Sequence, residues 1–136
     1  MLGSENLMAF VATTDAARAK SFYEDVLGLR LIADEPWAVV FDAHGTMLRV
    51  QKVRELTPAQ HTVLGWEVPD IGRAMSALRA QKVCFERYPF LEQDEAGAWT
   101  APGGAQVAWF KDPDGNVLSL TQSPALERDR VVPARH

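Results

Sequence analysis

The same order of predicted elements occurs twice in this chain of 136 residues, and this duplication limits the possible folds more than any other feature. Each copy begins with an extended segment, at Leu7 to Thr13 and at His61 to Val68, followed by an aspartate and a helical pattern. Strand-like pieces separated by glycine turns come next. The chain is therefore predicted to contain two tandem βαβββ modules and to belong to the α+β class.

Two amphipathic helices are predicted, one after Asp15 and one after Asp70, because an N-cap aspartate accepts hydrogen bonds from the first helical turn. Apolar residues recur every three or four positions and so share one face, with Ala19, Phe22, Tyr23, Val26 and Leu27 in the first helix and Ile71, Ala74, Met75 and Leu78 in the second. Gly28 ends the first helix. Lys82 lies directly between the second helix and the next strand, so we expect it to adopt a left-handed conformation.

The remaining strands are predicted from alternating and β-branched residues, at Arg30 to Ala33, Trp37 to Phe41 and Thr46 to Gln51 in the first copy, and at Val83 to Arg87, Gln106 to Phe110 and Val117 to Gln122 in the second. Asp112 and Asp114 resemble an acid pair, but they lie in a DPDG turn, where aspartate and glycine serve backbone geometry. We interpret both aspartates as structural.

The second copy carries an insertion. The helix caps Asp15 and Asp70 are 55 residues apart, whereas the hairpin residues Asp42 and Asp112 are 70 apart. The added residues fall within 86–104, which holds Tyr88, Phe90 and Trp99 among turn residues. Two interpretations stay open: the insertion is a lid over a pocket, or it is a surface loop that packs its aromatic side chains onto its own module.

The composition predicts one domain over 1–123, with module one at 5–52, module two at 60–122 and a tail at 124–136. No apolar run approaches the roughly 20 residues that span a bilayer, and the first residues lack a secretory pattern, so a cytoplasmic location is expected. A net charge of −4 leaves no basic field for nucleic acid. Cys84 lies between Val83 and Phe85, which predicts a buried, inert thiol.

Three stretches resemble the vicinal oxygen chelate superfamily, which includes glyoxalase I, extradiol dioxygenases, fosfomycin-resistance enzymes and bleomycin-resistance proteins. They are Asp15 with SFYEDVLGL at 21–29, WEVPDIGRAMSALRAQKV at 66–83 and FKDPDGNVLSL at 110–120, and they span almost the whole chain. The resemblance implies a cup-shaped mixed β-sheet with the helices on the outside. In metal-dependent members, four ligands come from the first, fourth, fifth and eighth strands.

Matching strand to strand puts these ligand positions at Met8, Arg49, Val63 and Ser119. A hard divalent cation needs several oxygen or imidazole donors, and an arginine repels it. We therefore expect no metal and no other cofactor. His61 shares a strand face with Val63, and it is interpreted either as a ligand contact or as a plain surface histidine, since a lone imidazole does not hold a catalytic metal.

Strand alternation predicts a mixed apolar and polar face, which is typical of small-molecule sites. The candidate ligand-binding residues on this face or at its mouth are Met8, Phe10, Met47, Arg49, His61, Val63, Glu67, Trp99, Trp109 and Ser119. Arg49 is suited to gripping a carboxylate or phosphate, although a salt bridge to Glu67 or another acid explains it equally well. Trp37, like Trp99 and Trp109, lies either at the mouth or in the core.

Several functions fit these observations. The leading hypothesis is a metal-free protein that binds and sequesters a hydrophobic or aromatic small molecule, which the acidic net charge allows to be cationic, as metal-free bleomycin-resistance relatives do. The alternatives are a metal-independent lyase or isomerase that uses Arg49 with His61 or Glu67, a module whose cup serves dimerisation, and a metal-dependent enzyme if the ligand register is misread. Whether the chain is an enzyme stays open. A homodimer with two equivalent pockets is expected.

Overall fold

A computed structural model describes residues 1–124, so the expected tail at 124–136 lies outside the described residues from 125 onward. The chain divides into two compact units, the first formed by Met1–Leu64 with Lys111–Leu118 and the second by Gly65–Phe110 with the chain from Ser119. The expected single domain over 1–123 stays a prediction.

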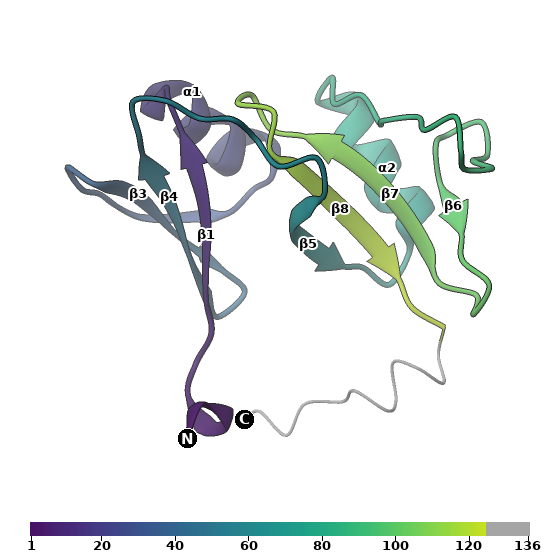
Figure 1. Cartoon of the computed structure of the whole chain (residues 1–136), viewed down its shortest axis with the longest axis horizontal. Coiled ribbons are helices and arrows are strands. Elements are labelled where there is room, and N and C mark those ends of the chain that lie inside the picture. The colour runs from purple at the N-terminus through teal and green to yellow at the C-terminus, as the bar shows by residue number, and fades with distance from the viewer. Residues whose placement is uncertain (125–136) are drawn as a thin grey trace. The chain divides into compact units, whose positions relative to one another are not determined.

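Each module forms a four-stranded sheet, and the two sheets have the same strand order (Figure 1). In the first the order is β1-β4-β3-β2, formed by β1 (Met8–Thr13), β4 (Thr46–Lys52), β3 (Ala38–Ala43) and β2 (Arg30–Asp34). In the second it is β5-β8-β7-β6, formed by β5 (Thr62–Glu67), β8 (Val117–Gln122), β7 (Gln106–Lys111) and β6 (Trp99–Thr100). This repeated order confirms the α+β class and the duplicated βαβββ module.

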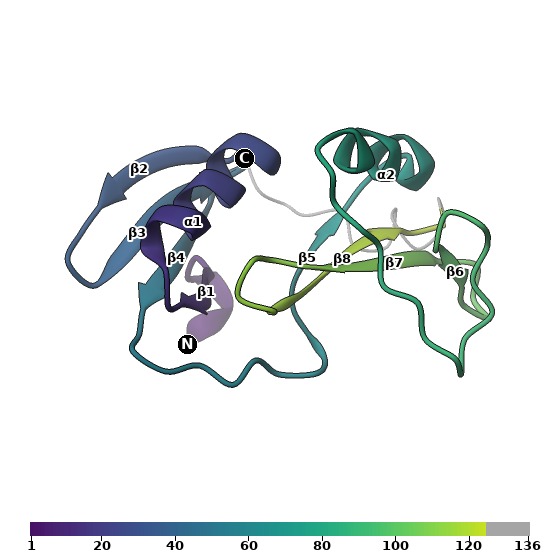
Figure 2. The same ribbon diagram turned by 90° about the horizontal axis from the view of Figure 1, so that it is seen from above.

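The helical segment of the first module covers one face of its sheet (Figure 2). It consists of α1 (Ala16–Ser21) and a π-helical segment η2 (Phe22–Val26), and it follows a short 3-10 helix, η1 (Leu2–Ser4), at the start of the chain. As predicted, the Asp15 carboxylate accepts a hydrogen bond from the Arg18 amide, and Gly28 ends the segment with φ +75°. The Leu27 amide donates to the Phe22 carbonyl, which gives the wider turn that apolar spacing does not reveal.

The core of the first sheet lies under this helical segment. Buried residues from β1, β3 and β4 share the covered face, because Val11 and Val39 both stand opposite Val50 and Phe41 stands opposite Leu48. Tyr23 packs against them, and its ring centroid lies 6.0 Å from that of Phe41. Full burial of such side chains stabilises the fold by roughly 1.5 to 3 kcal/mol each.

The helix of the second module is α2 (Ile71–Ala80), which lies over one face of the second sheet (Figure 2). The Asp70 carboxylate accepts from the Arg73 amide, as the cap prediction requires. Ile71 and Met75 are buried, and their spacing of four residues places both on one helix face. The duplicated caps therefore start both helices in the same way. Among the described residues, no helix has the length and apolar character needed to cross a membrane.

The predicted strand at Val83 to Arg87 is wrong. Within residues 83–87 only Phe85 forms a bridge, with Phe110, and the Glu86 amide donates to the Trp109 carbonyl. The edge of the sheet is instead formed by β6, which belongs to the insertion and pairs with β7. The predicted burial of Cys84 is also wrong, since Cys84 is exposed. Because a single bridge joins the segment 83–87 to the sheet, the segment is not a strand with one side covered, and Cys84 next to the bridge is exposed.

Lys82 adopts φ +68°, which confirms the predicted left-handed conformation. Replacing Lys82 with glycine should raise the free energy of unfolding by about 0.5 to 1 kcal/mol, because glycine has no Cβ to clash in this region. Urea unfolding of the two proteins measures the change. Lys82→Ala is the matched control, since it removes the side-chain charge but keeps the Cβ, and it should give no gain. A loss of stability in Lys82→Gly would contradict the argument.

Candidate functional site

The face of the first sheet that α1 does not cover carries three exposed apolar side chains. Met8 stands opposite Met47 in the parallel pairing of β1 and β4, and Phe10 stands opposite Arg49. The exposed fractions are 47% for Met8, 48% for Phe10 and 40% for Met47. We call Met8, Phe10, Met47 and Arg49 the open face of the first sheet. Large apolar side chains that lie together and stay this exposed are typical of a surface that binds a ligand or another protein.

Arg49 is paired on this face. Its guanidinium donates a hydrogen bond to Glu35 Oε1 at 2.9 Å, and the exposed fractions of the two side chains are 25% for Arg49 and 44% for Glu35. The sequence left open a salt bridge to Glu67 or another acid, and Glu35 is that acid. One carboxylate contact uses only part of the guanidinium donor fork. The pair therefore offers both donors and acceptors beside an apolar surface.

The other predicted site residues lie in several places. Val63 is 38% exposed on β5, and the neighbouring His61 is exposed with Nδ1 3.1 Å from the Thr62 carbonyl oxygen. Glu67 is exposed at the end of β5, whereas Ser119 is only 7% exposed within β8. The expected convergence of the four ligand positions stays a prediction. Trp37 is 77% exposed, so it is not a core residue.

The insertion brings Trp99 and Trp109 together in the second unit. Their ring centroids are 6.1 Å apart, and Tyr88 contacts Trp109 edge-on at 5.5 Å. Phe90 in turn lies 5.6 Å from Tyr88. These contacts support the interpretation of the insertion as a loop that packs its aromatic side chains onto its own module.

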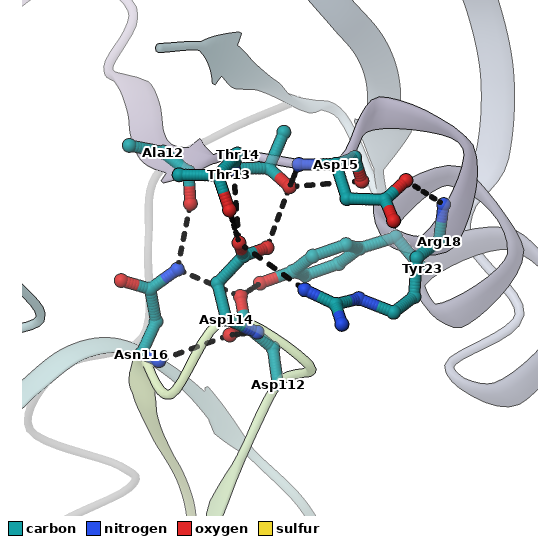
Figure 3. Close-up of polar contacts among 9 residues, drawn as sticks. All are labelled: Ala12, Thr13, Thr14, Asp15, Arg18, Tyr23, Asp112, Asp114 and Asn116. Atoms are coloured by element: carbon teal, nitrogen blue, oxygen red, sulfur yellow. Dashed lines mark hydrogen bonds and ion pairs between the residues drawn. The ribbon is translucent and has the colours of Figure 1, made fainter. Parts of the chain in front are cut away.

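A buried polar cluster in the first unit surrounds the turn between β7 and β8 (Figure 3). Asp112, 5% exposed, accepts hydrogen bonds from the Tyr23 hydroxyl at 2.7 Å and from Asn116 Nδ2 at 2.8 Å. Its other oxygen accepts from the Asp114 and Asn116 amides. Burial, and then the neighbouring Asp112 charge, raise the pKa of Tyr23 above its usual value, so the hydroxyl stays a donor.

Asp114 anchors the same turn to β1 (Figure 3). Its carboxylate accepts from the Thr13 hydroxyl and from the amide and hydroxyl of Thr14, and Arg18 lies 3.7 Å away. Desolvation acts to raise the pKa of Asp114, but these hydrogen bonds and the Arg18 charge outweigh it and lower the pKa below its usual value. The structural role predicted for both aspartates is confirmed. Their partners on β1 and η2 carry no sequence signal, because about a hundred residues separate them.

The donors at the expected metal positions do not suit a divalent ion. Met8, Arg49, Val63 and Ser119 would present a thioether, a guanidinium, an alkyl group and a hydroxyl, and Arg49 carries a positive charge. Within residues 1–124, no three or more His, Cys, Asp or Glu side chains are grouped so as to hold a metal ion.

The profile of the Glyoxalase/Bleomycin resistance protein/Dioxygenase superfamily matches residues 7–120. No curated protein matches the chain significantly.

Solved structures share the fold at low identity. A fosfomycin resistance protein, FosX, from Listeria monocytogenes is 12% identical with a TM-score of 0.72, covering 92% of this chain and 98% of its own. A lactoylglutathione lyase from Agrobacterium tumefaciens is 18% identical with a TM-score of 0.68, covering 88% and 94%. A superfamily member from Sphaerobacter thermophilus is 21% identical with a TM-score of 0.69, covering 90% and 100%.

Proposed function

Because the chain belongs to the Glyoxalase/Bleomycin resistance protein/Dioxygenase superfamily, we propose that it binds and sequesters a small molecule without a metal ion. The open face of the first sheet is the proposed site. The observation that carries the proposal is the juxtaposition of Met8, Phe10 and Met47, each at least 40% exposed, with the ion-paired Arg49.

This surface favours a ligand with an apolar, preferably aromatic, body and a polar end. The two thioethers and the phenyl ring are soft, polarizable contacts for an aromatic ring. The Arg49 guanidinium can donate to an anionic or neutral acceptor, and the neighbouring Glu35 carboxylate can accept from a donor. A few polar groups beside an apolar wall fix the orientation of a ligand, which sequestration requires.

A metal does not fit the donor set described above, so no step of this proposal runs through one. Two contacts favour binding over a lyase or isomerase reaction. Arg49 is already held by Glu35, which reduces its capacity to stabilise a developing anion, and His61 lies against the carbonyl of its own neighbour. The cytoplasmic location and the homodimer expected from the sequence belong to this proposal.

Anilinonaphthalene sulfonate, a dye with an aromatic body and an anionic end, is a suitable probe of the open face. We expect it to bind with a rise in fluorescence, and Phe10→Ala to weaken binding about tenfold, because a half-exposed phenyl ring contributes about 1.4 kcal/mol when a ligand covers it. Fluorescence titration measures the dissociation constant. EDTA and added Ni²⁺ should both leave it unchanged.

Ile32→Ala is the matched control, because Ile32 on β2 is 46% exposed, close to the 48% of Phe10, and does not belong to the open face. It should leave dye binding as in the wild type. Equal losses in Phe10→Ala and Ile32→Ala would indicate unspecific surface binding and contradict the proposed site. A titration that requires Ni²⁺ would instead place the chain with the metal-dependent members of the superfamily.

A further inference from the structure

Four aromatic rings form a continuous row in the second unit, which we call the aromatic row: Phe90, Tyr88, Trp109 and Trp99. Each ring contacts the next, at centroid distances of 5.6, 5.5 and 6.1 Å. The Trp99 and Trp109 rings are inclined by only 33°, whereas Tyr88 stands at 84° to Trp109. Two indoles tilted by 33° beside an upright phenol make a corner of aromatic surface.

The row lies on the side of the second sheet that α2 does not cover. Ala108 and Phe110 are fully buried in β7, and the Phe110 ring contacts Phe85, which carries Arg79 of α2 over its face. Since side chains alternate along a strand, Trp109 points to the opposite face. Trp99 stands opposite Val107 in β6, which places it on that same face.

The backbone of the insertion is held in place by side-chain hydrogen bonds. Gln93 accepts from the Tyr88 amide at 2.7 Å and donates to the carbonyls of Glu86 and Gly97 at 2.9 and 2.8 Å. Arg87 donates to the carbonyls of Gln93 and Asp94. The tyrosine is therefore positioned before any ligand arrives, which reduces the entropic cost of binding.

The insertion is acidic. Residues 86–104 contain four carboxylates, on Glu86, Glu92, Asp94 and Glu95, against the single cation of Arg87. The Glu86 carboxylate acts directly on the row, because its charge, after desolvation, raises the pKa of Tyr88 above its usual value. The faces of aromatic rings are themselves electronegative. Ring faces and carboxylates therefore both attract a positively charged ligand.

We propose that the aromatic row binds a planar organic cation, such as an aromatic ring system with a quaternary nitrogen. A flat ring would stack on the indoles, and its positive charge would be stabilised by the ring faces and by Glu86. An anionic ligand is disfavoured by the same charges. The aromatic row and the open face of the first sheet have no residue in common, so the two proposals can fail independently.

Two probes that differ mainly in charge test the proposal, N-methylphenanthridinium and neutral phenanthridine. Calorimetric titration at pH 8 should show that the cation binds about tenfold more tightly than the neutral ring. Tyr88→Ala should weaken binding of the cation about tenfold, and Phe90→Ala should weaken it to a smaller extent. Glu86→Gln should weaken binding of the cation several-fold more than binding of the neutral ring, because the substitution removes the carboxylate charge and keeps the size of the side chain.

Trp37→Ala is the matched control, since Trp37 is 77% exposed and lies outside the row. It should bind both probes as the wild type does. Equal affinities for cation and neutral ring would overturn the proposal, as would an equal loss in Trp37→Ala. If Tyr88→Ala unfolds, Phe90→Ala decides, because removing a side chain that is 79% exposed does not disturb the core. Phe10→Ala should bind the cation as tightly as the wild type does, whether or not the dye binds to the open face of the first sheet.

Discussion

Replacing Asp112 with alanine is expected to lower the free energy of unfolding by about 3 to 5 kcal/mol. The substitution removes the acceptor for the buried Tyr23 hydroxyl, for Asn116 Nδ2 and for two backbone amides of the turn. Each buried polar group left without a partner costs roughly 1 to 3 kcal/mol, and more when the lost partner is charged. Urea unfolding followed by circular dichroism measures the change.

Two variants locate the effect in this cluster. Asp25→Ala removes an exposed aspartate from η2 and should change stability by less than about 0.5 kcal/mol. Tyr23→Phe removes one donor while Asp112 keeps the others, so it should cost about 1 to 2 kcal/mol. If Asp112→Ala stayed within 1 kcal/mol of the wild type, the buried hydrogen bonds around Asp112 would not hold the turn.

Asp114→Asn should lower the free energy of unfolding by about 1 to 3 kcal/mol at pH 7, and this difference should disappear in acid. The Asp114 side chain is only 2% exposed and accepts charge-assisted hydrogen bonds from Thr13 and Thr14. Its pKa is lowered in the folded state, so its stabilisation is present above the unfolded pKa of about 4. The stabilisation is lost as the pH falls through the folded pKa.

Unfolding free energies measured between pH 7 and pH 2 test this dependence. The curves of the wild type and Asp114→Asn should converge at the acid end. Asp34→Asn is the control, because a hydrogen bond from Lys52 lowers the pKa of Asp34 at the surface, where solvent screens the interaction. Its curve should stay close to the wild type throughout. Parallel curves for the wild type and Asp114→Asn would show that the Asp114 charge does not stabilise the fold.

Local sequence was sufficient for the duplicated module. Asp15 and Asp70 act within one helical turn, and Gly28 and Lys82 set the backbone where each helix ends, so neighbouring residues alone determine these features. Strand alternation likewise separated the covered face, with Leu48 and Val50, from the open face. The match of Met8, Arg49, Val63 and Ser119 to the four ligand positions stays a prediction.

The site contacts could not be predicted in this way, because they depend on residues distant in sequence. Arg49 forms its ion pair with Glu35 rather than with Glu67, because the fold of the first module brings residue 35 beside β4. The predictions of a strand at 83–87 and of a buried Cys84 are wrong because another segment pairs with β7. This segment is β6, which is two residues long and belongs to the insertion.

The sequence by itself thus determined which residues begin helices and which alternate in strands, since each depends on side-chain chemistry or on backbone preferences over a few residues. Only the tertiary structure decided the partners of Arg49, Tyr23, Asp112 and Trp109. Tyr23 and Asp112 are separated by 89 positions, and their hydrogen bond forms only when burial removes both groups from water.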